Sequence, residues 1–566
     1  MFVKKKHYTT LILSGTFREG PLQSKSILNR TSTSDFRYDL FLSRIDWILR
    51  TKSVSRIIVE HRHDFAPRLF AGAEAVRREL QRLREAGKEL HFVSSGLDDL
   101  SLYIASVADR RYLHPTGAVT LRGLSRDFLF ARRLLEREGV TAHVHRRGKY
   151  KSAGDLVRAD HLEDATREEY QCYLDSVDDV LLTRTADALG TTAAKLRGYR
   201  EEPHLLDSAA REAGFCDELG SAEDLREQWK KEKYAEKKAR RLKPGFGKGA
   251  RIAVVVLEGT ITEGSSRRLP FMGQAIGSRS TVETLKVLRT SKKVRAVVAR
   301  INSPGGSAVA SDEIRHELAR LAEKKPLVLS MSEVAGSGGY WIATVGRRLF
   351  AEETTLTGSI GVIAATLDAS DMMRREGVTG EAVRTAPLAD VGAAYRRPTD
   401  EELRIAEAEV DQYYRAFLDH VASFRKASPE EIDEVAQGRI WSGRDAVDRG
   451  LVDAVGGLRD ALEAARGEIA AKKTRVDFYP RAKLNLVERL IAGGVSARLG
   501  DALTAALSGT RPGAALDTFG WTALQPHSLH SLHSLHPLHV LVRYVPFVSG
   551  RPLAVVPELW DMWRNT

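Results

Sequence analysis

Short apolar runs alternate with longer stretches of helical periodicity along the second half of the chain. The run Ile252–Leu257 is uninterrupted and rich in β-branched residues, which is typical of a strand buried on both faces. Val282, Leu285 and Leu288 then recur at the spacing of one helix face. We therefore expect an α/β fold in which helices cover a mostly parallel sheet. The further elements expected are a strand at Ala296–Ile301, a helix from about Ser311 to Ala322 and a strand at Leu327–Met331.

The first half of the chain carries a pattern similar to that of the second half, which indicates an internal duplication. Four matching segments follow in the same order, at offsets between 236 and 240 residues. Because the order is kept and the spacing is nearly constant, we expect two tandem copies of one domain. The matched pairs are Val54–Val59 with Val294–Ala299, Tyr103 with Tyr340, Val119-Thr120 with Leu356-Thr357, and Gly214–Asp217 with Gly450–Asp453.

The repeats divide the chain into four parts. We expect the first repeat at 1–222, a basic connector at 223–249, the second repeat at 250–472 and a C-terminal extension at 473–566. The extension holds an amphipathic stretch, Leu484–Leu507, and then a histidine at every third position. Such a tract is compatible with metal binding, but a low-complexity tail with its imidazoles facing solvent is the simpler interpretation. These histidines are His527, His530, His533, His536 and His539.

Composition places the chain among soluble globular proteins. It has 566 residues, of which 43% are hydrophobic and 29% charged, and these values exclude collagen-like and disordered classes. Its two cysteines, Cys172 and Cys216, are too few for a disulfide framework or a four-ligand zinc site and favour a reducing compartment. The sequence gives no sign of a metal ion or an organic cofactor, so we expect none.

The net charge of +12 is concentrated between Lys230 and Arg251, where ten basic residues stand against two acidic ones. A solvated helix with a linker accounts for such a run. Only Tyr234 and Phe246 lie among these charges, too few rings for a base-stacking surface, so we expect no nucleic-acid partner. No stretch approaches the roughly 18 apolar residues of a membrane span. The apolar run Leu11–Leu13 is also too short for a signal peptide.

A glycine-rich segment after the strand Leu327–Met331 is the strongest candidate for chemistry. It reads Glu333-Val-Ala-Gly-Ser-Gly-Gly-Tyr-Trp341 and places Ser337 after a small residue and before two glycines. A strand-to-helix turn of this kind exposes a hydroxyl and leaves the next backbone N–H groups free. An ordinary turn with a capping serine is the alternative. The earlier turn Asn302-Ser-Pro-Gly-Gly-Ser307 also presents N–H donors, so the two turns together favour a nucleophile facing an oxyanion hole.

A nucleophilic serine needs a base, and the second repeat offers no clear one. The first repeat has Leu100 in place of Ser337 but carries Lys151, which falls opposite Leu388 of the second repeat. One copy therefore holds a serine without a lysine, and the other a lysine without a serine. This complementary loss predicts one composite site where the copies meet. Two histidines of the second repeat fall within helical patterns, where surface or packing roles explain them: His316 and His420.

Six motifs, taken together, carry a resemblance to a known family. They are Asn302–Ser307, Ala335–Trp341, Leu356–Gly361, Gly148–Ala153, Gly438–Gly443 and Gly450–Asp453. In these motifs the chain is similar to signal peptide peptidase A, a family of serine–lysine endopeptidases on a Clp-protease/crotonase-like fold. The chain resembles the long, duplicated bacterial form over residues 8–470.

The resemblance implies a role for each candidate residue. Ser337 would be the nucleophile, Lys151 the general base and Ser359 the residue that positions the lysine. Gly336 stands where the family usually has alanine. The oxyanion hole would be formed by the backbone N–H groups of Gly338 and of Gly305 or Gly306.

Partners and location are also implied by the resemblance. The family cleaves signal-peptide remnants and other extended apolar peptides, and its members assemble into rings or domes, so we expect a homo-oligomer. Its N-terminal membrane anchor has no counterpart in this sequence. Contact with a membrane surface and a cytoplasmic location are therefore both open.

Lysine can act as a base only in a dry environment. Its ordinary pKa of about 10.4 keeps it charged at pH 7, and burial can lower that value by about 3–5 units. Lys151 must therefore lie among apolar groups with no carboxylate beside it, and the nearby Asp155 and Asp160 must point elsewhere. Two other classes stay open: a crotonase-like enzyme acting on acyl-CoA thioesters, which would need neither the serine turn nor the lysine, and a non-catalytic scaffold.

Overall fold

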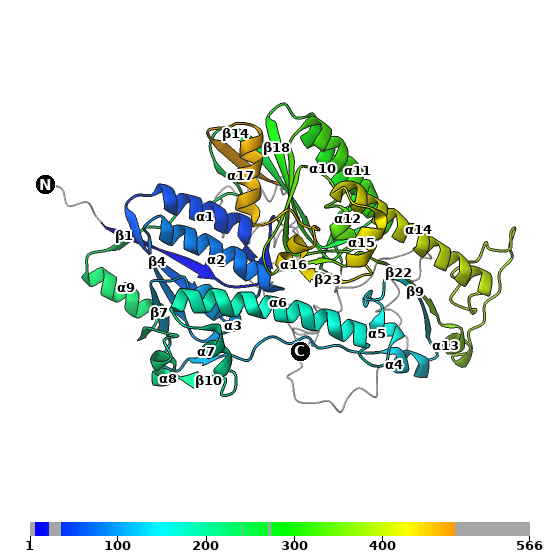
Figure 1. The fold of residues 1–566 in the computed structure, drawn as a ribbon, viewed down its shortest axis with the longest axis horizontal. Helices are drawn as coiled ribbons and strands as arrows, with labels where there is room; N and C mark the ends of the chain where they lie inside the picture. Colours follow the sequence, from blue (N-terminus) through cyan, green and yellow to red (C-terminus); the bar gives the residue numbers. More distant parts are fainter. Residues whose placement is uncertain (1–5, 22–34, 240–241, 270–272, 481–566) are drawn as a thin grey trace, which may run out of the picture.

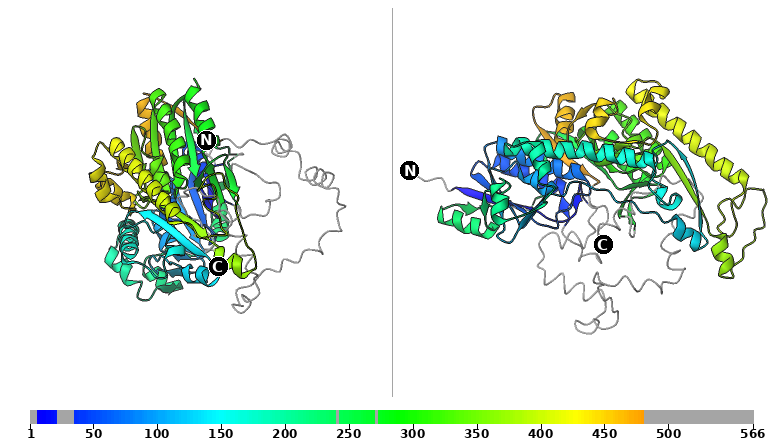
Figure 2. Two further views of the ribbon diagram at one scale, coloured as in Figure 1. Left: turned by 90° about the vertical axis from the view of Figure 1, so that its right-hand side faces the viewer. Right: turned by 60° about the horizontal axis from the view of Figure 1, so that its bottom comes forward.

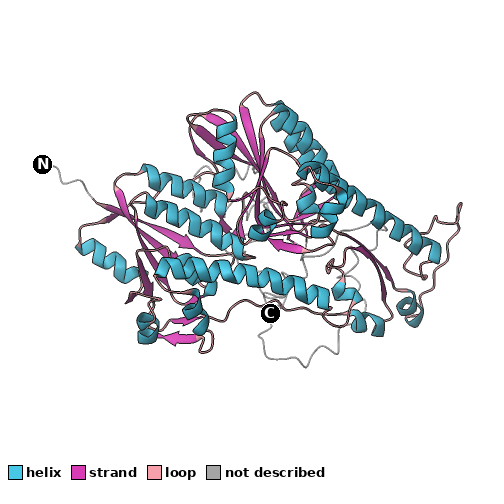
Figure 3. Cartoon of the chain, in the orientation of Figure 1, coloured by secondary structure: helices cyan, strands magenta, loops and turns pink. Residues whose placement is uncertain are grey.

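The computed structural model describes residues 6–21, 35–239, 242–269 and 273–480 (Figure 1). Two large sheets, one in each half of the chain, are covered by helices (Figure 3). The predicted α/β class is therefore confirmed. The amphipathic stretch 484–507 and the histidine tract 527–539 lie outside the described residues.

The sheet of the first half has six strands, all parallel, in the order β11-β7-β5-β4-β1-β12. Helices α1, α2 and α3 pack on one face, and the apolar side of α9 packs on the other. The strands are β1 (His7–Leu13), β4 (Val54–His61), β5 (Glu89–Ser94), β7 (Arg110–Leu113), β11 (Glu218–Leu219) and β12 (Ala235–Glu236). The helices are α1 (Tyr38–Arg50), α2 (Phe70–Glu85), α3 (Asp99–Ala105) and α9 (Ala222–Lys231).

The sheet of the second half runs in the order β13-β25-β14-β18-β19-β20-β24, and β21 joins β19 to β23. Its pairs are parallel except β13 with β25 and β21 with β23. Helices α10 (Ser278–Thr290) and α11 (Ala308–Lys324) cover one face. The strands are β13 (Phe246–Gly247), β14 (Ala250–Glu258), β18 (Val294–Ser303), β19 (Leu327–Gly336), β20 (Arg348–Ala351), β21 (Leu356–Gly358), β23 (Ile440–Ser442), β24 (Ala454–Val455) and β25 (Thr474–Tyr479).

The two halves share one hydrophobic core. Side chains of β14, β18 and α17 (Leu458–Glu468) belong to the same buried cluster as those of α1 and α2. A fully buried ion pair also joins the halves, with Arg300 Nη2 3.0 Å from Glu19 Oε1. In addition, β9 (Thr141–Arg147) pairs antiparallel with β22 (Val362–Asp368). One strand from each half therefore forms a shared two-stranded sheet (Figure 2).

The basic segment 223–249, expected as a connector, contains secondary structure of its own. Most of α9 lies in it, begun by a reciprocal cap between Ser221 and Asp224 and held down by the buried Leu225 and Trp229. Strand β12 adds to the first sheet through β1, and β13 adds to the second through β25. The apolar face of α9 explains this packing, because two large side chains leave solvent together.

The remaining elements are short strands, several short helices and the two 26-residue helices α6 and α14. In the described ranges, no helix is long and apolar enough to cross a membrane, and no group of three or more metal-ligating side chains occurs. The strands are β2 (Phe17–Arg18), β3 (Phe36–Arg37), β6 (Leu97–Asp98), β8 (Ala118–Thr120), β10 (His204–Leu206), β15 (Thr260–Thr262), β16 (Arg267–Leu269) and β17 (Gly273–Gly277). The helices are α4 (Arg132–Arg137), α5 (Asp155–Arg158), α6 (Asp164–Leu189), α7 (Ala193–Gly198), α8 (Asp207–Glu212), α12 (Gly338–Trp341), α13 (Ser370–Arg375), α14 (Asp400–Arg425), α15 (Pro429–Val435) and α16 (Gly443–Asp448).

Candidate active site

Ser337 lies in the sharp turn between β19 and α12. Its backbone has φ 52° and ψ −121°, a conformation that residues with a side chain rarely adopt. The turn is held by a hydrogen bond from Ser337 N to Gly358 O at 3.0 Å. The chain turns from strand to helix at Ser337, so the predicted turn is confirmed. A strained serine at such a turn is typical of an exposed nucleophile.

The glycine pair after β18 lies directly against this turn. A Cβ on Gly305 would fall 2.7 Å from Gly338 N and 2.9 Å from Ser337 Cβ, so no side chain fits there. The Gly305 N–H is already engaged, donating to Ser303 Oγ at 3.2 Å. The N–H groups of Gly306 and Gly338 have no acceptor among the described residues and are therefore available to a bound oxygen.

Lys151 reaches the same region from the loop that follows β9. Only 3% of the residue is exposed, and its Nζ donates to Ser359 O at 2.9 Å and to Ser359 Oγ at 3.0 Å. Burial lowers the pKa of the amine from 10.5 to about 7. Two glycines make room for the lysine: a Cβ on Gly438 would lie 2.8 Å from Lys151 Cα, and one on Gly361 would lie 3.1 Å from its Cδ.

Ser359 stands between the lysine and the serine turn. A Cβ on Gly336, the residue before Ser337, would lie 3.5 Å from Ser359 Cβ. Within the described chain, the amine bonds to Ser359, and no hydrogen bond joins it to Ser337. Catalytic hydrogen bonds are often loose without substrate. The structure thus brings Lys151 and Ser359 into contact. Ser337 directly follows Gly336, the glycine that lies next to Ser359.

The acidic residues near Lys151 in sequence point away from it, as expected. Asp155 accepts hydrogen bonds from Arg146, Arg158 and Thr166. Asp160 faces Arg133 and His161. Two of these contacts are ion pairs within about 3 Å, so neither carboxylate is free to hold the lysine amine.

A third carboxyl group, distant in sequence from Asp155 and Asp160, acts on the lysine. Glu169 of α6 is completely buried, and its charge is the one that acts on the pKa of Lys151. Burial raises the pKa of Glu169 to about 8, so this carboxyl is largely protonated at neutral pH. The sequence did contain a signal, because Glu169 falls on the buried stripe of α6 together with Thr166 and Tyr173.

Packing and surface positions account for the two histidines of the second repeat, His420 and His316. His420 Nε2 lies 3.4 Å from Asp312 Oδ1, and its ring packs edge-on against Trp341. His316 is exposed on α11. Leu388, the counterpart of Lys151 in the repeat alignment, is 40% exposed in the loop before α14.

Comparison with known proteins agrees with these features. Peptidase family S49 matches residues 82–236 and 319–472. Protease 4 of Salmonella typhi is 31% identical over 468 residues, which cover 77% of this chain and 74% of that protein. The chloroplastic serine protease SPPA of Arabidopsis thaliana is 31% identical over 430 residues, covering 73% and 62% of the two chains.

A shorter relative matches part of the chain. The putative signal peptide peptidase SppA of Enterococcus faecium is 32% identical over 219 residues, which cover 38% of this chain and 63% of that protein. The family match covers both halves of the chain, and each matched half includes one side of the lysine–serine site. The chain therefore belongs to peptidase family S49, as a serine protease of the signal peptide peptidase A type.

Proposed function

We propose that the protein is an endopeptidase in which Ser337 is the nucleophile and Lys151 the general base. The observation that carries the proposal is the buried amine of Lys151, held by Ser359 and free of any ion pair within the described residues. A neutral amine has two N–H donors and one lone pair. With both donors bound to Ser359, the lone pair is left to accept the proton of Ser337.

The reaction then follows the acyl-enzyme route. Ser337 Oγ bonds to the peptide carbonyl carbon while its proton passes to Lys151 Nζ, and the carbonyl oxygen takes the negative charge. The N–H groups of Gly338 and Gly306, which have no acceptor among the described residues, would bind that oxygen, each being worth about 3–4 kcal/mol. The ammonium next gives its proton to the leaving amine as the C–N bond breaks. Water hydrolyses the acyl ester by the same proton transfers.

Extended apolar peptides, including signal-peptide remnants, are the proposed substrates. Strand β15 lies beside the glycine pair, since Ile261 forms a parallel bridge with Gly306. An extended peptide laid beside the glycine-rich turns would be bound mainly through its backbone, which tolerates many sequences. The name of the Enterococcus faecium relative points to the same substrate class.

A fluorophosphonate probe tests the nucleophile directly. We expect labelling at Ser337 in the parent protein, none in Ser337→Ala and strongly reduced labelling in Lys151→Ala. Lys149→Ala is the matched control, because Lys149 lies in the same loop but is exposed. Labelling that survives in Lys151→Ala at the parent rate would refute the dyad. Absence of labelling at Ser337 in the parent protein would refute Ser337 as the nucleophile.

We also propose that the protein forms a homo-oligomeric ring or dome. The support is a group of apolar side chains exposed in the segment between α13 and α14: Val378, Val383, Leu388 and Val391. Such a group costs free energy in water and is typical of a surface that a second copy covers. Light scattering should give a mass of several chains, and a monomer at micromolar concentration would contradict this.

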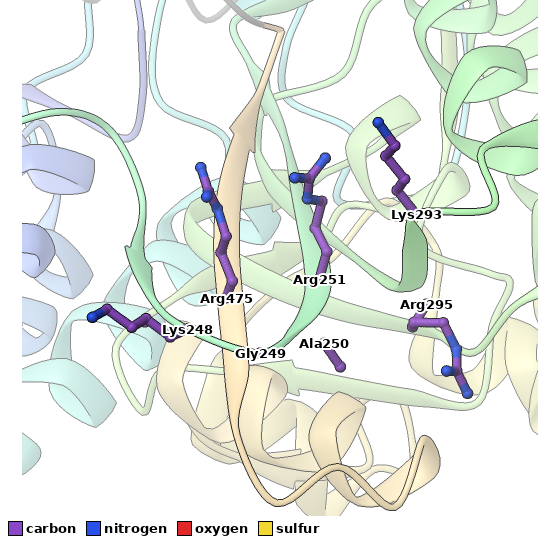
Figure 4. Close-up of a pocket in the computed structure, with 8 residues that line it drawn as sticks. Lys248, Gly249, Ala250, Arg251, Lys293, Arg295 and Arg475 are labelled. Carbon is purple, nitrogen blue, oxygen red and sulfur yellow. The ribbon is translucent and has the colours of Figure 1, made fainter.

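Contact with an anionic membrane surface is proposed from a basic cavity of about 430 Å³ (Figure 4). It lies at the amino ends of β14 and β18, opposite the strand ends that carry the serine turn. The cationic residues that line it are Lys248, Arg251, Lys293, Arg295 and Arg475. Clustered cations attract anionic headgroups. Sedimentation with phosphatidylglycerol vesicles but not with phosphatidylcholine vesicles is expected, and equal binding to both would reject the proposal.

A further inference from the structure

A buried carboxyl group joins the two sides of the lysine site. Glu169 lies in the first turns of α6 and has no exposed surface. Its Oε1 accepts a hydrogen bond from Ser152 Oγ at 3.0 Å, and its Oε2 accepts one from Ile440 N at 3.1 Å. Within the described residues it forms no ion pair. A buried acid with two neutral partners is unusual, because carboxyl groups rarely leave water unpaired.

These two partners are the immediate neighbours of the catalytic contact. Ser152 follows Lys151 directly in the chain. Ile440 begins β23, and the residue before it, Arg439, accepts a hydrogen bond from Ser359 N at 2.7 Å through its carbonyl oxygen. The Glu169 carboxyl therefore ties the loop that carries the amine to the strand that holds the amine's acceptor.

We propose that Glu169 is a titratable positioning residue of the active site. As a neutral carboxyl group it ties the Lys151 loop to β23, and when it loses its proton its charge holds the proton on Lys151. This rests on the proposed role of Lys151 as the base. Within the described residues Glu169 forms no hydrogen bond to Ser337, so it acts through the lysine.

The charged groups around Glu169 leave Lys151 as its main electrostatic partner. Arg439 is the other cation that acts on it, but Arg439 pairs with the exposed Glu168, 3.1 Å away. On the α5 side, Asp155 forms ion pairs with Arg146 and Arg158. Tyr170, next along α6, is neutral, since burial raises its pKa to about 12.

The coupling has a definite sign. With the pKa of Lys151 near 7 and that of Glu169 near 8, both groups are largely uncharged between these values. A Glu169 anion stabilises the ammonium and so opposes formation of the base. Two groups coupled in this way titrate as a pair. The rise of activity with pH therefore extends over a wider pH range than the titration of a single group would.

The test compares pH profiles of kcat/KM for the parent protein and Glu169→Gln. Glutamine copies the protonated acid, because its carbonyl can accept from Ile440 N while its amide donates to Ser152 Oγ. We expect kcat at pH 8 to stay within about threefold of the parent. In Glu169→Gln the rise of kcat/KM with pH should be as steep as that of a single ionisation. The midpoint of this rise should be lower than in the parent by up to about one pH unit.

Asp175→Asn is the matched control, with the same kind of chemical change at an exposed site farther along α6, where the printed hydrogen-bond partner is the neutral Gln171. It should leave the midpoint and the slope unchanged. An unchanged profile in Glu169→Gln would overturn the proposal and make the residue merely structural. A shift of equal size in Asp175→Asn would overturn it too, since any loss of negative charge would then suffice.

A third variant separates hydrogen bonding from charge. Glu169→Ala removes both hydrogen bonds, so kcat should fall at every pH by at least about tenfold, while Glu169→Gln restores it. Equal activity of the two variants would refute the positioning role. Fluorophosphonate labelling of Ser337 in Lys151→Ala reports on the dyad separately, so a failure of the base assignment is distinguishable from a failure of the Glu169 proposal.

Discussion

Burial of Lys151 should cost folding free energy that an uncharged side chain of similar shape recovers. Lys151→Met keeps an unbranched apolar stem and removes the amine. The pKa of the lysine falls from 10.5 to about 7 on folding. Since each pKa unit corresponds to about 1.4 kcal/mol, keeping the amine unprotonated costs about 4 kcal/mol at pH 7.

The sign of this effect fixes its dependence on pH. Between pH 7 and about pH 10 the unfolded lysine binds a proton that the folded lysine has released, so stability rises with pH across this window. The advantage of methionine should therefore shrink, from about 4 kcal/mol at pH 7 to about 2 kcal/mol at pH 9. The two hydrogen bonds to Ser359 offset part of it, by about 1 kcal/mol each.

Guanidinium unfolding followed by circular dichroism measures the effect. We expect Lys151→Met to unfold at a higher denaturant concentration than the parent at pH 7, with a smaller difference at pH 9 and no peptidase activity at either pH. The exposed Lys149→Met serves as the control and should show neither change. A variant less stable than the parent at pH 7, or a gain that does not decline with pH, would refute the argument from desolvation.

Three further outcomes follow from the same site. In the parent protein kcat/KM should rise about tenfold per pH unit below pH 7 and level off at alkaline pH, as Lys151 loses its proton; an acid optimum in a peptide-cleavage assay contradicts a lysine base. Gly438→Ala should lower kcat at least about tenfold, because Gly438 has φ 77° and a Cβ there would lie 2.6 Å from Lys151 N. Turnover equal to that of the parent protein would contradict this expectation. Gly336→Ala should keep activity within about threefold, since its Cβ would find its nearest neighbour at 3.5 Å, an ordinary contact; inactivation of a folded variant would show that the turn tolerates no side chain.

The sequence allowed the local elements and the chemistry-bearing turns to be predicted. The strands expected at 252–257, 296–301 and 327–331 all lie within β14, β18 and β19. Such runs are visible because parallel strands buried on both faces need continuous apolar residues. The serine turn was visible because few sequences other than glycine-rich ones permit a sharp strand-to-helix turn.

Features that depend on long-range packing were not predicted. Nothing local marks Thr141–Arg147 as a strand whose partner lies more than two hundred residues later. Glu169 was not predicted either, because it lies 18 positions after Lys151 and reaches the lysine loop only through the packing of α6. The repeat offset places Leu100 opposite Ser337, whereas the residue at the start of α3 that corresponds to Ser337 at the start of α12 is Asp98.

The register of one strand pair accounts for the meeting of the lysine with Ser359. Arg147, the last residue of β9, lies opposite Val362, the first residue of β22. Because the pair is antiparallel, the chain leaving β9 toward Lys151 and the chain entering β22 from Ser359 occupy the same end. A slip of one residue would displace the two by about 3.3 Å, which exceeds the tolerance of the 2.9 Å bond from Lys151 Nζ to Ser359 O. The seven paired positions of β9 and β22 therefore fix the contact between Lys151 and Ser359, although Lys151 and Ser359 lie outside both strands.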